Sequence, residues 1–148
     1  MWKETLDKVR DREAGYGGKL NEPASEEDIR KFREKVESLS IIVPNEYYDF
    51  LRVINGVEYN SFIIYGIDED LLDKETAQGT TGFLFQREVW EETASGKFTY
   101  LGESSIDFFA YGVETQKYYV LDNGSEDIME EFNTLDELLE RILSHSLL

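Results

Sequence analysis

The chain has 148 residues, of which 32 are acidic and 15 basic, so its formal net charge is −17. It contains no cysteine, which excludes a disulfide framework, a cysteine-ligated zinc ion and a thiol nucleophile. It also has no run of about 18 apolar residues, which argues against a membrane-spanning helix. Its length suits one domain, 1–148, with a hydrophobic core of its own.

The negative charge is uneven along the chain. Residues 1–74 hold 17 acidic and 11 basic residues, whereas residues 75–148 hold 15 acidic and 4 basic residues. A field of this sign repels nucleic acid and anionic lipid and attracts basic proteins. We therefore expect a protein partner and neither nucleic acid nor a membrane. A role of the charge in solubility alone is an open alternative.

Two helices are predicted before residue 40. The first covers 2–13, with an apolar stripe of Trp2, Leu6 and Val9. This segment is charged and lacks the apolar core of a signal peptide, so we expect a cytoplasmic protein. The glycine-rich stretch 14–18 ends the helix and lacks the spacing of a phosphate-binding loop. Ser25 is the predicted N-cap of the second helix. The apolar stripe of that helix is Ile29, Phe32, Val36 and Leu39.

The second helix also carries the one basic cluster of the sequence. Its members are Arg30, Lys31, Arg33 and Lys35. Most of them lie four residues from a glutamate, as in Glu26–Arg30 and Arg33–Glu37, a spacing that pairs opposite charges on a helix surface. The pattern predicts a solvated, internally paired face more than an RNA-binding surface.

The stretch 41–67 predicts the nucleus of the core. Pro44 suits a helix start, because its missing N–H costs nothing there. The apolar stripe that follows is Tyr47, Phe50, Leu51 and Ile54. Asn55 and Gly56 predict the end of the helix, with Gly56 in the left-handed conformation. A polar turn and then a strand over 62–65 complete the stretch.

An acidic segment follows this strand. Asp68, Glu69 and Asp70, with Asp73 and Glu75 nearby, could hold a divalent cation, but the segment lacks the glycine and glutamate positions of an EF-hand loop. We predict a solvated or partner-facing acidic edge and no metal. A loop over 76–82 and a short helix over 83–93 come next.

The region 98–132 predicts a β-meander with strands over 98–102, 107–112, 117–121 and 127–132. Turn residues separate the strands, and Asn123-Gly124 is the strongest hairpin signal in the chain. Aromatic side chains occupy both faces of these strands. Thr134 opens a C-terminal helix as part of a capping box. The apolar stripe of this helix is Leu135, Leu138, Leu139 and Ile142. His145, the one histidine, falls after that stripe and is expected to be exposed.

No catalytic constellation emerges from these elements. The chain has one histidine, near its C-terminus, and no Gly-x-Ser-x-Gly motif. Carboxylates are so abundant that a pair close enough for acid–base chemistry would arise by chance. The residues alone thus predict an acidic α+β protein in which helices at both ends pack around a mostly antiparallel sheet. They predict no enzyme activity, no cofactor and no bound metal.

The central stretch resembles the SUKH superfamily of small bacterial immunity proteins, which has relatives among eukaryotic cell-wall regulators. The residues that carry the resemblance are Pro44, Tyr47 or Tyr48, Phe50, Leu51, Asn55, Gly56, Tyr65 and Gly66. Val43 departs from the family pattern, which usually has leucine before the proline. The glycines at 17–18, the helix from Ser25 and the segments 100–102 and 107–111 extend the resemblance over nearly the whole chain.

The resemblance implies a SUKH-like fold for 1–148 and a protein, monomeric or weakly dimeric, that binds and neutralises a cognate polymorphic toxin. A basic toxin domain such as a nuclease would suit the acidic chain. We place the partner surface on Glu58, Asp68, Glu69, Asp70 and Asp73. The competing acidic set is Glu126, Asp127, Glu130 and Glu131. Two alternatives remain: a small ligand-binding or enzymatic domain with a pocket on the aromatic sheet face, and a regulatory interaction module.

Overall fold

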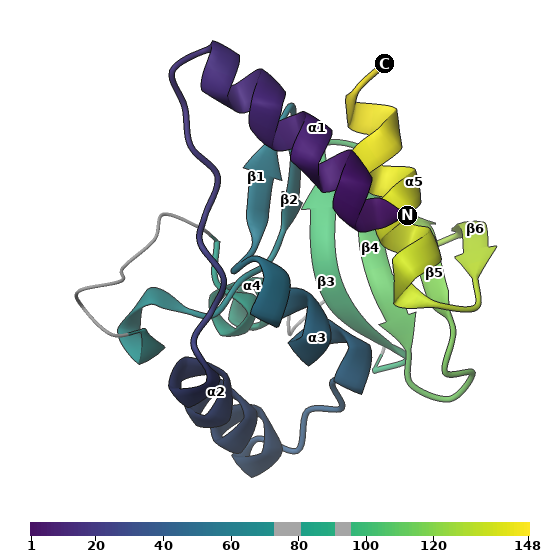
Figure 1. The fold of residues 1–148 in the computed structure, drawn as a ribbon. Helices are drawn as coiled ribbons and strands as arrows, with labels where there is room; N and C mark the ends of the chain where they lie inside the picture. Colours follow the sequence, from purple (N-terminus) through teal and green to yellow (C-terminus); the bar gives the residue numbers. More distant parts are fainter. Residues whose placement is uncertain (73–80, 91–95) are drawn as a thin grey trace.

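The computed structural model describes residues 1–72, 81–90 and 96–148, and within them the chain forms five α-helices and a six-stranded sheet (Figure 1). The helices are α1 (Trp2–Gly15), α2 (Glu26–Ser38), α3 (Asn45–Val53), α4 (Phe83–Trp90) and α5 (Leu135–Ser146), with a short 3₁₀ helix, η1 (Glu69–Leu71). The strands are β1 (Val57–Tyr59), β2 (Phe62–Ile64), β3 (Phe98–Ser104), β4 (Asp107–Gly112), β5 (Tyr118–Asp122) and β6 (Ile128–Phe132). The predicted α+β class is confirmed.

The strands of the sheet follow one another in chain order, and every neighbouring pair is antiparallel. This confirms the meander predicted for 98–132. The sequence prediction misses β1, which joins β2 through a two-residue turn. Asn60 and Ser61 form that turn with φ values of 45° and 74°. Positive φ at both central residues is typical of a type I′ hairpin, which Asn-Gly indicates far more strongly than Asn-Ser.

Helices α1, α3 and α5 cover one face of the sheet, which we call the inner face (Figure 1). Side-chain hydrogen bonds join α1 to α5: Trp2 Nε1 donates to Asp136 Oδ1 at 2.9 Å, and Thr5 Oγ1 donates to Glu140 Oε2 at 2.8 Å. The core between the helices and the inner face includes Leu6, Phe50, Leu51, Leu101, Phe109, Val120 and Leu139. The predicted apolar stripes of these helices therefore point inward, as amphipathic helices require.

Glu46 links three of these elements at the inner face. From α3, one of its carboxylate oxygens accepts from the hydroxyl of Tyr118 on β5 at 3.2 Å, and the other accepts from Leu135 N at the start of α5 at 3.1 Å. Burial and the nearby Glu46 carboxylate raise the pKa of Tyr118 above the ordinary tyrosine value. Glu46 thus fixes the distance between the central helix, the sheet and the last helix.

The central stretch folds largely as predicted, with one correction. α3 ends at Val53, and Ile54 is already extended, with φ −158° and ψ 137°. Gly56 takes the predicted left-handed conformation at φ +79°, but in the chain after the helix and not as its immediate cap. The extended residue at 54 allows Asn55 to point its side chain toward the sheet, where Asn55 Oδ1 accepts from Ile67 N at 2.7 Å.

One further local prediction is wrong, and another is confirmed only in part. Leu39 follows the last residue of α2 and is 51% exposed, so it does not extend the buried stripe. The hairpin predicted at Asn123-Gly124 is present between β5 and β6, but its turn places Glu126, not Asn123 or Gly124, at positive φ. The Asp122 side chain organises this turn by accepting from Gly124 N and Ser125 N at 3.1 and 2.9 Å. An aspartate-capped turn replaces the tight Asn-Gly turn because this side chain bonds the backbone ahead of it.

None of the helices within the described ranges combines the length and apolar character needed to cross a membrane.

Candidate functional site

The excess negative charge lies outside the three N-terminal helices. By sequence, residues 1–56 hold 12 acidic and 10 basic residues, whereas residues 57–148 hold 20 acidic and 5 basic residues. In the structure many charges of the first part cancel in ion pairs. Arg30 contacts Glu27 and Glu34, and Arg52 contacts Glu26 and Asp49. The basic cluster on α2 is therefore an internally paired face, as predicted, and the net charge belongs to the remainder of the molecule.

Only some of the five residues of the predicted partner surface are exposed. Glu58 on β1 and Glu69 and Asp70 on η1 are exposed. Glu58 Oε1 accepts from the backbone N–H and the hydroxyl of Thr81 at 2.9 and 2.8 Å. Asp73 lies outside the described residues. The three exposed carboxylates can still contribute to an acidic surface, although Glu58 also holds the segment before α4.

Asp68 has a structural role instead. Its side chain is buried, at 8% exposure, and its two carboxylate oxygens accept from Leu84 N and Phe85 N at 2.8 Å each. These are free N–H groups at the start of α4, so Asp68 caps that helix from a distant part of the chain. Burial raises its pKa above the usual aspartate value, and the two N–H donors oppose that rise. Asp68 is therefore not available to a partner.

Strand register brings separate acidic and apolar residues together on the second, outer face of the sheet. Residues directly opposite one another in antiparallel strands share a face. One cross-strand row joins both sheet edges and consists of Glu58, Ile63, Glu103, Phe108, Leu121 and Ile128. A second row consists of Tyr100, Ala110, Tyr119 and Glu131. The outer face thus connects the predicted acidic edge to the competing acidic set.

Aromatic rings pack together in the middle of this outer face. The Tyr100 and Phe108 rings stack at 4.8 Å between centroids, and the Phe98 and Tyr119 rings meet edge to face at 5.6 Å. The Tyr100 hydroxyl donates to Glu126 Oε1 at 2.6 Å. Burial, together with the Glu126 carboxylate, raises the pKa of Tyr100. These rings form a second, smaller hydrophobic cluster, separate from the core on the inner face.

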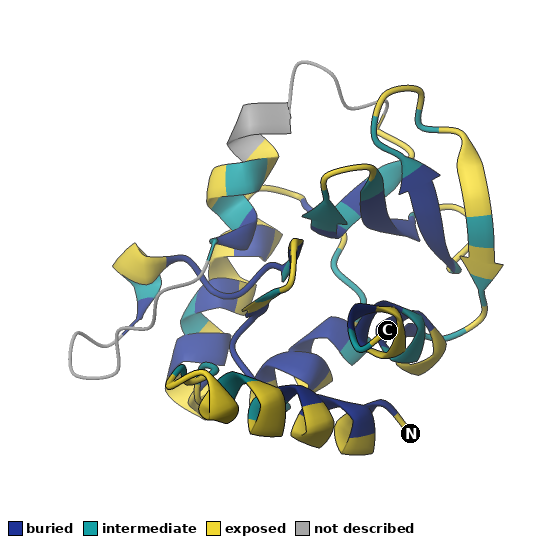
Figure 2. Cartoon of the chain, turned by 90° about the horizontal axis from the view of Figure 1, so that it is seen from above, coloured by how far each residue is buried: buried dark blue, intermediate teal, exposed yellow. Residues whose placement is uncertain are grey.

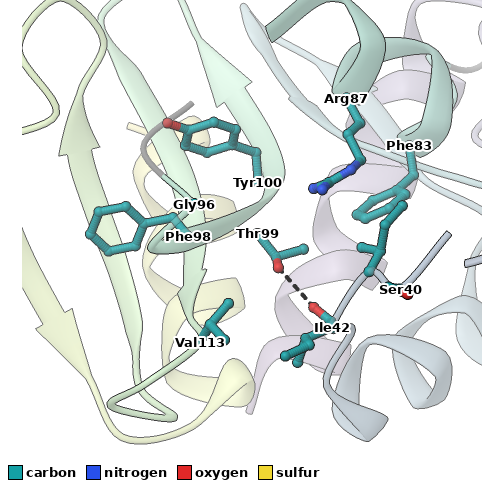
Figure 3. Close-up of a pocket in the computed structure, with 10 residues that line it drawn as sticks. Ser40, Ile42, Phe83, Arg87, Gly96, Phe98, Thr99, Tyr100 and Val113 are labelled. Carbon is teal, nitrogen blue, oxygen red and sulfur yellow. Dashed lines mark hydrogen bonds between the residues drawn. The ribbon is translucent and has the colours of Figure 1, made fainter. Parts of the chain in front are cut away.

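Two hollows adjoin the aromatic cluster. The first, of about 260 Å³, lies between α4, β3 and the segment before α3. In it Thr99 points to the Ile42 carbonyl, to which its hydroxyl donates at 2.7 Å, and Arg87 extends inward from α4 (Figure 3). The rings of Phe98 and Tyr100 point to the other side of β3 (Figure 3).

The second hollow, of about 540 Å³, lies on the outer face itself. Phe98 and Tyr119 line it, together with polar residues of the neighbouring turns, Lys97, Glu114, Glu126 and Asp127. This is the predicted location of a pocket on the aromatic sheet face. It is an open hollow with charges of both signs at its margin.

β6 forms the last edge of the sheet and carries the competing acidic set. Glu130 contacts Arg141 of α5 at 2.7 Å, and Glu131 contacts Lys117 at 3.5 Å. Next to these carboxylates, Ile128 and Met129 are 57% and 61% exposed. A bulge at this point places two residues of β6 opposite one of β5. Two exposed apolar side chains lie among the carboxylates of this edge, whereas near η1 the exposed apolar residue is Phe85 of α4, at 62%. Sequence periodicity does not reveal these side chains.

Within the described ranges, no group of three or more histidine, aspartate or glutamate side chains is arranged to hold a metal ion. His145 is exposed near the end of α5, as predicted.

Comparison of the chain with models of protein families and with curated proteins returns no match.

Proposed function

We propose that this chain is an immunity protein that binds and neutralises a cognate bacterial toxin of the polymorphic, contact-dependent or secreted class. Two observations support this function. The central stretch resembles the SUKH superfamily, in which such immunity proteins occur. The observation that carries the proposal is the separation of charge, because residues 57–148 hold 20 acidic and only 5 basic residues.

The separated charge suits a basic protein partner. An acidic surface attracts a basic one over several ångströms and speeds productive encounters. A toxin domain that acts on nucleic acid needs a basic active site, so a protein of opposite charge would be drawn to that site and would cover it. The partner class is accordingly a basic toxin domain such as a nuclease, and the protein acts as a monomer or weak dimer in the cytoplasm.

Two surfaces can receive such a partner. The surface around η1 offers Glu58, Glu69 and Asp70. The β6 edge offers Asp127 and Glu131 together with exposed apolar side chains. Interfaces need desolvated anchors as well as charge, because surface charges chiefly set the association rate. The β6 edge is therefore the stronger candidate.

Toxin binding can be tested with the C-terminal domain of the large secreted protein expected to be encoded directly upstream. Co-expression of the chain should restore growth of cells that produce this domain. The association rate of the chain with the toxin domain should then be measured at several salt concentrations. It should be lower for a variant in which the charges of the contact surface are reversed. The two variants to compare are Asp127→Lys/Glu131→Lys and Glu69→Lys/Asp70→Lys. Asp68 is left unchanged because it caps α4.

The association rates of the two variants distinguish a binding surface on β6 from one around η1. The β6 variant should associate about tenfold more slowly and show a flatter salt dependence, while the η1 variant changes little. The reverse result would move the binding surface to η1. If neither variant alters the rate, attraction by charge is the wrong mechanism. If no such upstream domain exists, or if it remains toxic in the presence of the chain, the immunity function is wrong.

The second candidate function is a small ligand-binding or enzymatic domain. The hollow of about 540 Å³ on the outer face favours it, since two aromatic rings and charged groups converge there. A fragment screen by NMR would discriminate the two functions. Saturable chemical-shift changes at Phe98 and Tyr119 on addition of a small molecule would support this candidate. The immunity function predicts no saturable binding of a small molecule at these residues.

A further inference from the structure

β6 forms one edge of the sheet, so only one of its sides pairs with another strand. It follows β5 at the end of the sheet, and Figure 2 shows it as a largely exposed strand at the margin of the molecule. An edge strand presents unpaired backbone N–H and C=O groups along its free side, which can pair with another extended segment. The opposite edge differs, because Glu58 of β1 holds the segment at Thr81 against it.

The side chains of β6 determine which residue types such a segment would need. Ile128 and Met129 are more than half exposed, which provides apolar contact area. Glu131 shares the outer face with Tyr119, and Asp127 is exposed just before the strand. In an extended segment with basic side chains on this face, the charged groups would meet carboxylates and the aliphatic stems would cover Ile128.

A second copy of this chain fits the same edge poorly. An antiparallel pairing of β6 with itself about its midpoint would put Glu130 opposite Glu130 and Met129 opposite Glu131. Like charges directly opposite one another destabilise a strand pair. Two chains of charge −17 would also repel each other over longer distances. The charge of the edge thus opposes self-association and favours a basic occupant.

We propose that β6 binds an extended, lysine- or arginine-containing segment of the partner as a seventh strand of the sheet. This inference rests on the proposed function for the identity of the partner, and adds how the partner is held. Main-chain hydrogen bonds provide the register. The basic side chains lie on the outer face and provide the selectivity, and the apolar residues that alternate with them point to the opposite face and favour the extended conformation. The bound segment would extend the row of side chains that ends at Ile128 and the row that ends at Glu131.

The proposal can be tested without the toxin, using synthetic peptides and the ¹⁵N-labelled chain. The probe is a capped peptide of five Lys-Val repeats. Two matched peptides serve as controls: five Lys-Gly repeats keep the charge but form strands poorly, and five Glu-Val repeats keep the strand preference but reverse the charge. Amide shifts and amide hydrogen exchange report the site and the pairing.

The Lys-Val peptide should shift amides at 127–132 and slow exchange of β6 amides by about tenfold or more, because newly paired N–H groups are protected. The Lys-Gly peptide should give small, salt-sensitive shifts without protection, and the Glu-Val peptide none. Equal effects of the two lysine peptides, or shifts centred on Glu69 and Asp70, would overturn the proposal. So would a dimer of the chain paired through β6.

Side-chain variants give an independent test. Ile128→Ser/Met129→Ser should weaken Lys-Val binding about tenfold, since it removes the apolar contact but no charge. The control is Ile106→Ser, a side chain that is 69% exposed in the turn between β3 and β4. Equal loss in both variants would contradict a site on β6. Peptide binding at β6 with no binding of the upstream domain would reject the immunity function alone, whereas toxin binding that these variants leave unchanged would reject strand addition alone.

Discussion

Asp68 illustrates how one acidic residue can differ from its neighbours in the same cluster. Both of its carboxylate oxygens accept backbone N–H groups of α4, whereas Glu69 and Asp70 are exposed. A side chain at 82 would collide with the Asp68 carboxylate, because a Cβ built there lies 2.9 Å from the Asp68 Cα and closer still to the carboxyl group. Gly82 therefore makes room for the cap, and the two residues act as one unit.

The first prediction concerns this cap. Asp68→Ala leaves two N–H groups at the start of α4 without their partner and should lower the free energy of unfolding by about 0.5–2 kcal/mol. Chemical denaturation with urea measures this loss. Glu69→Ala, one position along the chain, is the control and should change stability by less than about 0.5 kcal/mol. Equal losses in the two variants would mean that Asp68 is not a cap.

The distinction between Asp68 and its neighbours could not be predicted from the local sequence. Three consecutive acidic residues look alike, and the N–H groups that Asp68 binds belong to a helix that begins at Phe83. The same holds for Asn55, which the sequence suggests as a helix end. In the structure it is fully buried and joins Ile67 to the segment before α2, since its own N–H donates to Glu22 O at 3.0 Å. Such roles depend on contacts across the chain.

Sequence periodicity predicts the helices and strands better than it predicts the roles of single side chains. The apolar stripes locate α1, α2, α3 and α5, and alternation with turn residues locates β3 to β6. The missing strand, β1, has three residues, too few to show a period. An aromatic sheet face was predicted but not the residues that form it, because bulges next to Tyr100 and Val120 change which side chains share a face. The candidate binding edge was therefore predicted as a set of charges, without its apolar contacts.

The second prediction tests the central helix and the turn after it. Leu51 is fully buried, so Leu51→Ala should destabilise the fold by about 2–5 kcal/mol through lost contacts and a cavity. Gly56→Val should cost about 1–2 kcal/mol or more, because a β-branched side chain resists the φ of +79° found there. Thermal and urea unfolding measure both changes.

Leu39→Ala is the matched control for the central helix, since Leu39 is half exposed at the end of α2. It removes the same atoms as Leu51→Ala but should change stability little. If Leu51→Ala and Gly56→Val unfold like the unaltered protein, the packing of α3 and the conformation after it are wrongly assigned.

In the whole molecule, the N-terminal helices and the remainder of the chain differ in net charge. The N-terminal helices supply much of the core and cancel their own charges in surface ion pairs. Residues 57–148, which include the sheet and α5, share that core but carry most of the net charge. Self-repulsion in the second part costs folding stability, and a basic partner would relieve it. The negative charge therefore favours binding of a basic partner and lowers the folding stability of the unbound protein.

The third prediction follows from this self-repulsion. Raising NaCl from about 0.02 to 0.3 M shortens the screening length to below about 10 Å, so repulsion among distant carboxylates should weaken and the midpoint of thermal unfolding should rise. The surface ion pairs of α2 and α3 are screened as well, but each contributes only about 0–1 kcal/mol. A net gain of about 1 kcal/mol would raise the midpoint by about 2–8 °C.

Neutral variants separate screening from general effects of salt. Glu69→Gln/Asp70→Asn removes two exposed negative charges of η1, so it should raise the midpoint at low salt and reduce its further rise with NaCl. Replacing the same number of paired carboxylates in α2, with Glu27→Gln/Glu34→Gln, should not raise the midpoint, because Arg30 then loses both partners. A midpoint that falls with NaCl, or that rises equally in all three proteins, would show that repulsion among the carboxylates of residues 57–148 does not limit the stability of the unbound protein.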